Sequence, residues 1–299
     1  MTLENTIDTN DKAGKNQFTR RFSGSKTAIL GSFILILVSF SAIFAPLIAQ
    51  NDPASLSLIR RLKAPGFVEK STNSQFILGT DTLGRDVFSR LVYGARIPLI
   101  VGLSAVLLSG TTGILLGLIS GFFGGKVDDV IMRIADIQLS FPTILLALAI
   151  MAVLGAGLDK LIIVLGLTGW VQYGRIVRGQ VLSIKQEEFI LAARATGERN
   201  WSILFEQILP NIWSPVIVIA SFSIASNIIS EASLSFLGVG VPPQIPSWGV
   251  MLAEGRQYVG IAEWLTIPPG LAISLTVLSI NILGDWLRDY LDPRLKNIM

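Results

Sequence analysis

A polar stretch rich in small residues, EEFILAARATGERNWSILFEQILPN, lies between two strongly apolar segments and is the first candidate for function. It runs from Glu187 to Asn211 and mixes acidic, basic and small side chains. Four of its residues fall at i, i+3, i+4 and i+7 and therefore share one helical face: Phe189, Ala192, Ala193 and Thr196. A face of mostly small side chains lets another surface approach the helix backbone closely. The pattern therefore favours docking of another protein over catalysis.

The margins and ends of this helix support the same interpretation. Glu188 and Arg194 are available for polar contacts beside the small face. Gly197 is suited to end a helix in the left-handed conformation, and Pro210 stands where the next apolar segment begins. We therefore expect a helix over about residues 186–200 with stiff connections at both ends. Spacing alone leaves open that it is a solvated, amphipathic loop helix without a partner.

The chain lacks the residue types that catalysis and metal binding most often use. It contains no His and no Cys, which removes the commonest general base, the commonest metal ligand and every thiolate site. The nearest match to a phosphate-binding loop is SGFFGGKVDD. It has Ser120 where the first Gly of that motif belongs and Val127 after the Lys. We expect no catalytic residues, no metal site and no cofactor within this chain.

A second set of candidates consists of polar residues inside apolar segments. They are Asn227, Ser230, Glu231 and Asn281. For any one of them, hydrogen bonding between packed helices is the favoured explanation. Taken together, they are also consistent with a polar path for a hydrophilic solute. Glu231 ends its segment at the predicted outer mouth, where a cap, a loop anchor and a gate are all possible roles.

Composition indicates that these residues belong to an integral membrane protein. The 299 residues are 51% hydrophobic and only 15% charged, with a mean hydropathy of +0.61, and an ordinary soluble domain has about 25% charged residues. Because the net charge is only +3 and the basic residues are scattered, nucleic acid is not an expected partner. Six segments are long and apolar enough to span a lipid bilayer: 28–49, 97–123, 137–158, 161–182, 212–230 and 264–284.

Two of these segments need comment. The first, at 28–49, is too long for a cleavable signal peptide, so we expect an uncleaved signal anchor. The fourth carries Arg175 and Arg178 in its last turns, where we expect the long side chains to reach the lipid headgroups.

The distribution of Lys and Arg predicts the orientation. Fifteen fall on the side of the N-terminus and nine on the other, and seven of those nine lie in one long loop. Basic residues favour the cytoplasmic side. We therefore expect cytoplasmic tails at 1–27 and 288–299, an external loop at 50–96, and a core of five helices over 97–287.

The external loop contains an amphipathic pattern, GTDTLGRDVFSRLVYGAR. We expect Asp81 to cap a helix that lies at the membrane interface, and Asp86 to pair with Arg90 at i,i+4. This helix is interpreted either as a lid that anchors the second span or as a docking surface for an external partner.

The sequence AARATG, followed by nine residues and then QILP, resembles the EAA signature of ABC importer permeases, E-A-A-x-x-x-G-x9-I-x-L-P. Ala192, Ala193, Gly197, Leu209 and Pro210 fall on signature positions. Leu191 replaces the signature Glu and Gln207 replaces its Ile, so Glu188, one turn earlier, is the candidate for the acidic contact. Further stretches are similar to the second permease of the dipeptide/oligopeptide/nickel branch, over roughly residues 28–296: LGTDTLGRDVFSRLVYGARIPL, GFFGGKVDDVIMRIADIQLSFPTILLAL, SEASLSFLGVGVPPQIPSWGVML and GDWLRDYLDPRL.

The resemblance implies an all-α integral membrane protein with six transmembrane helices and the type I ABC importer permease fold. It implies a bacterial inner (cytoplasmic) membrane location, a homologous second permease subunit, and an extracytoplasmic solute-binding protein. Two ABC ATPase subunits would bind ATP and Mg, so this chain is not expected to be an enzyme. The ATPase-coupling residues implied are Glu188, Phe189, Ala192, Ala193, Arg194, Gly197, Leu209 and Pro210.

The solute and two other functional classes remain open at this point. Di- and oligopeptides are the default of the branch, while similar permeases serve nickel complexes, glutathione or sugar-like compounds. An ion-coupled carrier or channel acting alone is the main alternative, although charges within the spans are few. A receptor or assembly scaffold that has kept the permease fold is the third.

Overall fold

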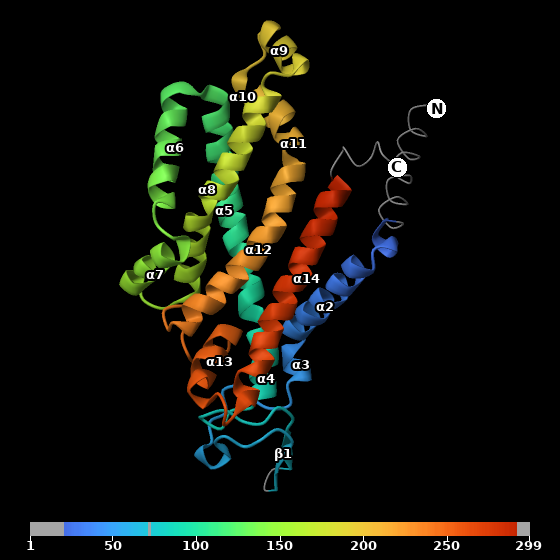
Figure 1. The fold of residues 1–299 in the computed structure, drawn as a ribbon, viewed down its shortest axis with the longest axis vertical. Coiled ribbons are helices and arrows are strands. Elements are labelled where there is room, and N and C mark those ends of the chain that lie inside the picture. The colour runs from blue at the N-terminus through green and yellow to red at the C-terminus, as the bar shows by residue number, and fades with distance from the viewer. Residues whose placement is uncertain (1–20, 71–72, 292–299) are drawn as a thin grey trace.

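The computed structural model describes residues 21–70 and 73–291, so the predicted tails lie largely outside the described residues. Long helices run side by side along one axis (Figure 1). The α-helices are α2 (Lys26–Ile43), α3 (Ala45–Ile48), α4 (Val87–Gly94), α5 (Arg96–Phe123), α6 (Gly125–Leu139), α7 (Thr143–Leu154), α8 (Leu158–Ile184), α9 (Glu188–Ala195), α10 (Asn200–Ser202), α11 (Leu209–Asn211), α12 (Trp213–Phe236), α13 (Trp248–Gly255) and α14 (Ile267–Leu291).

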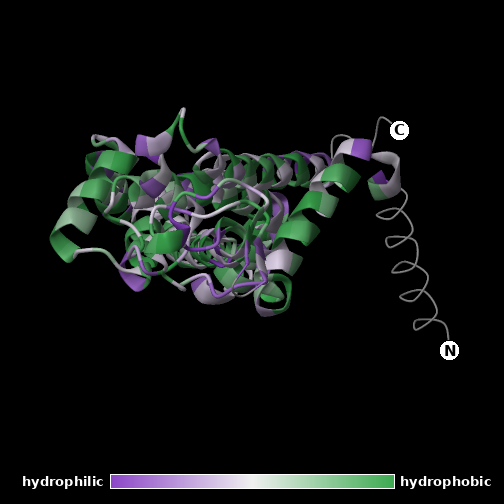
Figure 2. Ribbon diagram, turned by 90° about the horizontal axis from the view of Figure 1, so that it is seen from below, coloured by the Kyte–Doolittle hydropathy of each residue, from purple (hydrophilic) through white to green (hydrophobic). Residues whose placement is uncertain are grey.

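The bundle has two distinct ends. Helix α9 stands at one end, and strand β1 (Phe67–Glu69) with its loops stands at the other (Figure 1). We call these the α9 end and the β1 end. Seen from the β1 end, the long helices are predominantly hydrophobic, and hydrophilic segments gather in the loops (Figure 2). An apolar cluster around Val101, Leu161 and Leu234 joins α5, α8 and α12. A second cluster, around Leu118, Val181 and Ile208, holds the α9 end together.

Glycines allow α5 and α8 to pack backbone against backbone. A Cβ atom on Gly113 would lie 2.5 Å from the Trp170 carbonyl oxygen, and one on Gly117 would lie 2.6 Å from that of Gly174. Such distances are too short for any side chain unless the backbones separate. Close approach through small residues is the usual way in which membrane helices gain contact. The pair α5–α8 is therefore a rigid centre of the subunit.

Replacing Gly113 with alanine should destabilise the protein by about 1–3 kcal/mol, because the new methyl group overpacks the α5–α8 contact. Gly110 lies one turn away on the same helix, and there a Cβ atom would meet its nearest neighbour, Tyr173, at an ordinary 3.6 Å. Gly110→Ala should therefore leave stability nearly unchanged. Thermal unfolding of the purified variants in detergent checks the difference, and equal midpoints would contradict it.

The six predicted spans are confirmed in part. Among the described residues, four helices are long and apolar enough to cross a membrane: Lys26–Ile43, Val87–Phe123, Trp213–Phe236 and Glu263–Leu291. A fifth crossing results if α6 and α7 count as one bent span. Helix α8 covers the predicted span 161–182 but carries Arg175 and Arg178. The count of six stays a prediction.

The span predicted at 137–158 is wrong as one continuous helix. Helices α6 and α7 meet at 85° across a break between Leu139 and Thr143. Pro142 explains the break, because it has no N–H for the helix ladder and disfavours helical backbone at Phe141 before it. A similar interruption at Phe44 divides the first predicted span into α2 and α3, with a proline at the start of α3.

The loop predicted at 50–96 contains more than a helix. Strands β1 (Phe67–Glu69) and β2 (Ser74–Phe76) pair antiparallel, with Phe67 opposite Phe76. The protein is therefore mostly helical but not all-α. The helix predicted in this loop is α4, which begins only at Val87.

Candidate functional site: helix α9 and the elements that hold it

Helix α9 covers Glu188–Ala195, a shorter range than the predicted 186–200. Glu188 stands in its first turn and Arg194 in its last, and each charge interacts favourably with the helix dipole at its end. The end of the helix is as predicted, because Gly197 has φ +77°. Gly197 N–H donates to Arg194 O and Glu198 N–H to Ala193 O, the two bonds of a Schellman motif. The helix therefore ends sharply, and its direction is fixed.

One side of α9 is held by the subunit itself, and the other is free. Ile190 and Ala193 are buried in the cluster at the α9 end, which also contains residues of α5 and α8. Phe189, Ala192 and Thr196 are exposed. The predicted small-residue face is thus split: three of its members point away from the bundle, while Ala193 packs inward. Exposed Leu191, at the position of the signature Glu, extends the free side.

Side chains of Arg194 in α9 and of Glu198, just after it, contact neighbouring elements. The Arg194 guanidinium lies over the Phe122 ring at the end of α5, 5.1 Å from its centre, as in a cation–π contact. Glu198 accepts from Ser202 Oγ at 2.6 Å and from Gln207 Nε2 at 2.5 Å. Gln207 is the second departure from the signature, and its amide gives Glu198 a partner that the usual Ile does not supply.

A turn over residues 196–199 follows α9, and short helical segments then lead from Asn200 to α12. A π-helix, η2 (Ile203–Ile208), follows α10 and leads into α11, which contains Leu209 and Pro210. Ile203 and Ile208 are fully buried in the same cluster as Ile190. Leu209 is half-buried, while Pro210 is exposed. The segment between α9 and α12 is therefore packed into the apolar cluster at the α9 end.

The predicted path residues are distributed over two helices. Asn227, Ser230 and Glu231 lie on α12, and Asn281 lies on α14. Both asparagines are half-buried, and Ser230 Oγ donates to the Ser226 carbonyl at 2.9 Å.

Glu231 differs from the others because it is fully buried. It accepts from Ser235 Oγ at 2.8 Å. Close packing surrounds it, since a Cβ atom on Gly249 of α13 would meet the Ala232 carbonyl at 2.7 Å. Glu231 thus lies inside the subunit, where α13 packs on α12.

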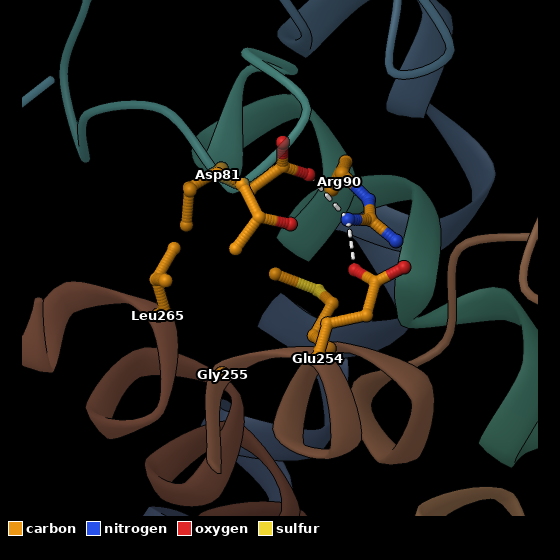
Figure 3. Close-up of a pocket in the computed structure, with 8 residues that line it drawn as sticks. Asp81, Arg90, Glu254, Gly255 and Leu265 are labelled. Atoms are coloured by element: carbon orange, nitrogen blue, oxygen red, sulfur yellow. Dashed lines mark hydrogen bonds and ion pairs between the residues drawn. The ribbon is translucent and has the colours of Figure 1, made fainter. Parts of the chain in front are cut away.

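A buried ion network ties the loop at the β1 end to α13 (Figure 3). Asp81 Oδ2 accepts from Arg85 Nε at 2.6 Å and from Arg90 Nη1 at 2.5 Å. Glu254 on α13 accepts from both arginines. All of these groups except Glu254 are almost completely buried, and burial alone would lower the pKa of Arg85. The carboxylates of Asp81 and Glu254 outweigh that effect and hold the pKa above its usual value.

This network corrects two predictions about the loop. The residue that caps α4 is Asp86, which accepts from Phe88 N and Ser89 N, and not Asp81. Arg90 contacts Asp81 and Glu254 instead of the Asp86 carboxylate. The reason is a tight turn at Gly84, with φ +77°, that folds Asp81 back over the start of the helix. A cavity of about 10 Å³, the space of about one water molecule, lies on one side of these groups. We call the network a clamp because its ion pairs join the loop to α13.

A second group of charges has partners that were not predicted from the sequence. Arg178 binds Asp128 of α6 with two bonds of 2.6 Å. Arg175 pairs with Asp136, which also lies on α6. The span had been predicted to begin at Ile137, which left both aspartates in a loop. The missed signal was apolar residues at helical spacing through that region, at Val127, Val130 and Ile134.

Comparison with known proteins decides the family. The model of the binding-protein-dependent transport system inner membrane component matches residues 113–297, which is more than half of the chain. The chain belongs to this family of transport proteins. Residues 16–65 also match the N-terminal transmembrane domain of oligopeptide transport permease C. As a member of the family, the protein is a membrane permease component rather than an enzyme.

Full-length relatives support the assignment. The di/tripeptide permease protein DppC of Pseudomonas aeruginosa is 43% identical over 94% of this chain and 92% of its own length. The oligopeptide permease protein OppC of Bacillus subtilis is 39% identical, covering 92% and 88%. The glutathione permease protein GsiD of Pectobacterium atrosepticum is 42% identical, covering 94% and 91%. The predicted resemblance to dipeptide and oligopeptide permeases is confirmed.

A solved transporter has a similar fold. The inward-facing MetNI methionine ABC transporter matches with a TM-score of 0.55 and 20% identity, over 68% of this chain and 96% of that chain. This chain therefore shares the permease fold of that ABC importer, whereas an identity this low gives no information about the solute.

Proposed function

We propose that this protein is one of two permease subunits of an ATP-driven importer of di- or oligopeptides. Relatives that carry peptides, at about 40% identity over nearly the whole chain, support the solute class. The observation that carries the coupling role is the free side of α9, a stiff helix that is anchored on one side only. A homologous permease, two ABC ATPases and an external solute-binding protein complete the proposed assembly.

In this proposal the α9 end faces the cytoplasm and the β1 end faces outward. An ATPase subunit contacts the exposed side of α9 through Phe189, Ala192 and the charged margins, and it binds the ATP and Mg that this chain does not. When the ATPases close, α9 moves, and the helical connection through η2 and α11 tilts α12. The two permeases then alternate between outward-open and inward-open states.

Reconstitution in proteoliposomes tests the proposal. The complete assembly, with its binding protein, should accumulate radiolabelled dialanine only when ATP is supplied, and omission of this chain should abolish uptake. The purified chain alone should hydrolyse no ATP. Dialanine flux driven by an ion gradient through the chain alone would favour a solitary carrier instead. Unchanged uptake without this chain would favour a scaffold role.

A further inference from the structure

Helix α6 presents three different sides. Its inward side carries Asp128, Ala135 and Gln138, which contact α5 and α8. One exposed flank is apolar and consists of Val127, Val130, Ile134 and Ile137. A second exposed flank is polar and consists of Asp129, Arg133, Asp136 and Ser140. At about 100° per residue the three sets occupy different sectors of the helix, with exposed Leu139 between the inward side and this second flank. We call the last set the polar flank.

The polar flank continues onto α8 through an exposed ion pair. Arg175 of α8 donates to Asp136, and their side chains are 46% and 53% exposed. Gln172, almost one turn before Arg175, is exposed too. In contrast, the Arg178–Asp128 pair is largely covered. The pair at Asp136 is therefore accessible from outside the packed contact between α6 and α8.

This ion pair lies deep along the bundle. Gln138, two residues after Asp136, donates to the Thr168 carbonyl at 2.6 Å and accepts from Trp170 Nε1 at 2.9 Å. Gly169, between those two, lies beside Ser109, at the middle of α5. Helix α5 is about 42 Å long at 1.5 Å per residue, and the hydrocarbon core of a bilayer is about 30 Å thick. With the bilayer centred on the middle of α5, Asp136 stands at the depth of the hydrocarbon layer.

Ionised side chains at that depth do not face lipid, because their transfer from water is too costly. The apolar flank of α6 is suited to lipid, but the polar flank requires water or a matching polar surface. Discontinuous helices beside a central water-filled path are a recurring arrangement in transporters, and α6 breaks just after the polar flank, before Thr143. A polar flank at this depth is what a helix beside such a path would present.

We propose that Asp136 and Arg175, with Gln172 beside them, form a binding station for a zwitterionic solute in the translocation path. This inference rests on the proposed import of peptides. A free peptide carries an ammonium group and a carboxylate, and Asp136 and Arg175 provide the complementary charges. Guanidinium and carboxylate groups bind each other through charge-assisted hydrogen bonds.

The Asp136–Arg175 ion pair is also suited to repeated binding and release of solute. When no solute is bound, the two side chains neutralise each other, so the path contains no uncompensated charge. A zwitterion exchanges this one ion pair for two and leaves the net charge at zero. Neither partner is buried, so separation of the pair exposes no orphaned group.

Thiol labelling tests the position of the polar flank. This chain contains no cysteine, so a single introduced cysteine is the only thiol of this subunit, and its labelling is read on this subunit after the assembly has been separated. Asp136→Cys and Gln172→Cys should react with a membrane-impermeant, cationic methanethiosulfonate reagent, at least about tenfold faster than Ile134→Cys on the apolar flank. Equal rates, or protection of the polar flank by the second permease, would overturn the path assignment.

Substrate selectivity tests the binding station itself. Uptake of dialanine, its N-acetyl form and its C-terminal amide is measured in the reconstituted assembly, normalised to the amount of complex, always with the same binding protein. Arg175→Gln should lower dialanine uptake about tenfold or more while changing amide uptake little. Asp136→Asn should lower dialanine uptake about tenfold or more while changing uptake of the N-acetyl form little. Comparison of these ratios between variants cancels the selectivity of the binding protein.

Matched controls come from α14, where Asp285 and Arg288 are also exposed charges. Asp285→Asn and Arg288→Gln should leave all three uptake ratios unchanged. The double variant with Asp136→Arg and Arg175→Asp should retain more dialanine uptake than either single replacement. Wild-type uptake of dialanine with unaltered ratios in the variants would refute the station but leave the proposed function standing. No uptake of any peptide by the wild type would refute both.

Discussion

Replacing Asp81 with alanine is expected to destabilise the protein by about 3–5 kcal/mol, because two almost fully buried arginines lose one of the two carboxylates that they share. Arg90 is only 2% exposed and depends on Asp81 and Glu254 for its charge. Asp81 also accepts from the backbone N–H groups of Leu83 and Arg85, so the turn before α4 is lost with it. The midpoint of thermal unfolding in detergent should fall on the order of 10 °C.

Two further variants separate the causes. Asp81→Asn keeps an oxygen that can accept from the backbone but removes the charge, so its effect should be intermediate. Glu263→Ala removes an exposed carboxylate near the same end of the bundle and should change stability by no more than about 0.5 kcal/mol. If Asp81→Ala and Glu263→Ala unfold at the same temperature, the network is not the clamp described above.

Replacing Gly197 with valine is expected to uncouple ATP hydrolysis from transport. Gly197 has φ +77°, a conformation that costs an L-residue about 1–2 kcal/mol and is most unfavourable for β-branched side chains. The Schellman bonds to Arg194 and Ala193 then break, and the free side of α9 loses its fixed direction. Uptake of dialanine by the reconstituted assembly should fall about tenfold or more, while the ATPases keep hydrolysing ATP.

The matched control is Gly197→Asn, because asparagine adopts the left-handed conformation readily. Space does not interfere, since a Cβ atom at this position would meet nothing within 4 Å. Asparagine should therefore retain most of the transport that valine loses. Equal loss in the two variants, or full activity in both, would show that the backbone conformation of Gly197 does not matter for coupling.

Much of the architecture was predictable because membrane spans leave a strong local signal. The apolar runs around 28–49, 97–123, 212–230 and 264–284 each contain a helix that is long and apolar enough to cross a membrane. The left-handed end of α9 was also predictable, because few residues other than glycine accept that conformation. The spacing of AARATG and QILP was sufficient to identify the family.

Contacts between segments that are distant in the sequence were not predictable, because no local pattern specifies which charges will meet. Pro142 was visible, yet only the structure shows that it turns α7 by 85° from α6. The periodicity that placed Ala193 on the docking face left open which side of the helix the bundle covers.

By itself, the sequence determined the membrane class, most of the spans and the family, since these depend on composition and on spacing along one chain. Only the tertiary structure decided the partners of the charged residues. Arg90 reaches Glu254, and Arg175 reaches Asp136, because packing brings together helices that are separated in the sequence. An ionised group at membrane depth must contact a charged partner or water. Which of the two it contacts depends on neighbouring helices, whose positions the sequence alone does not give.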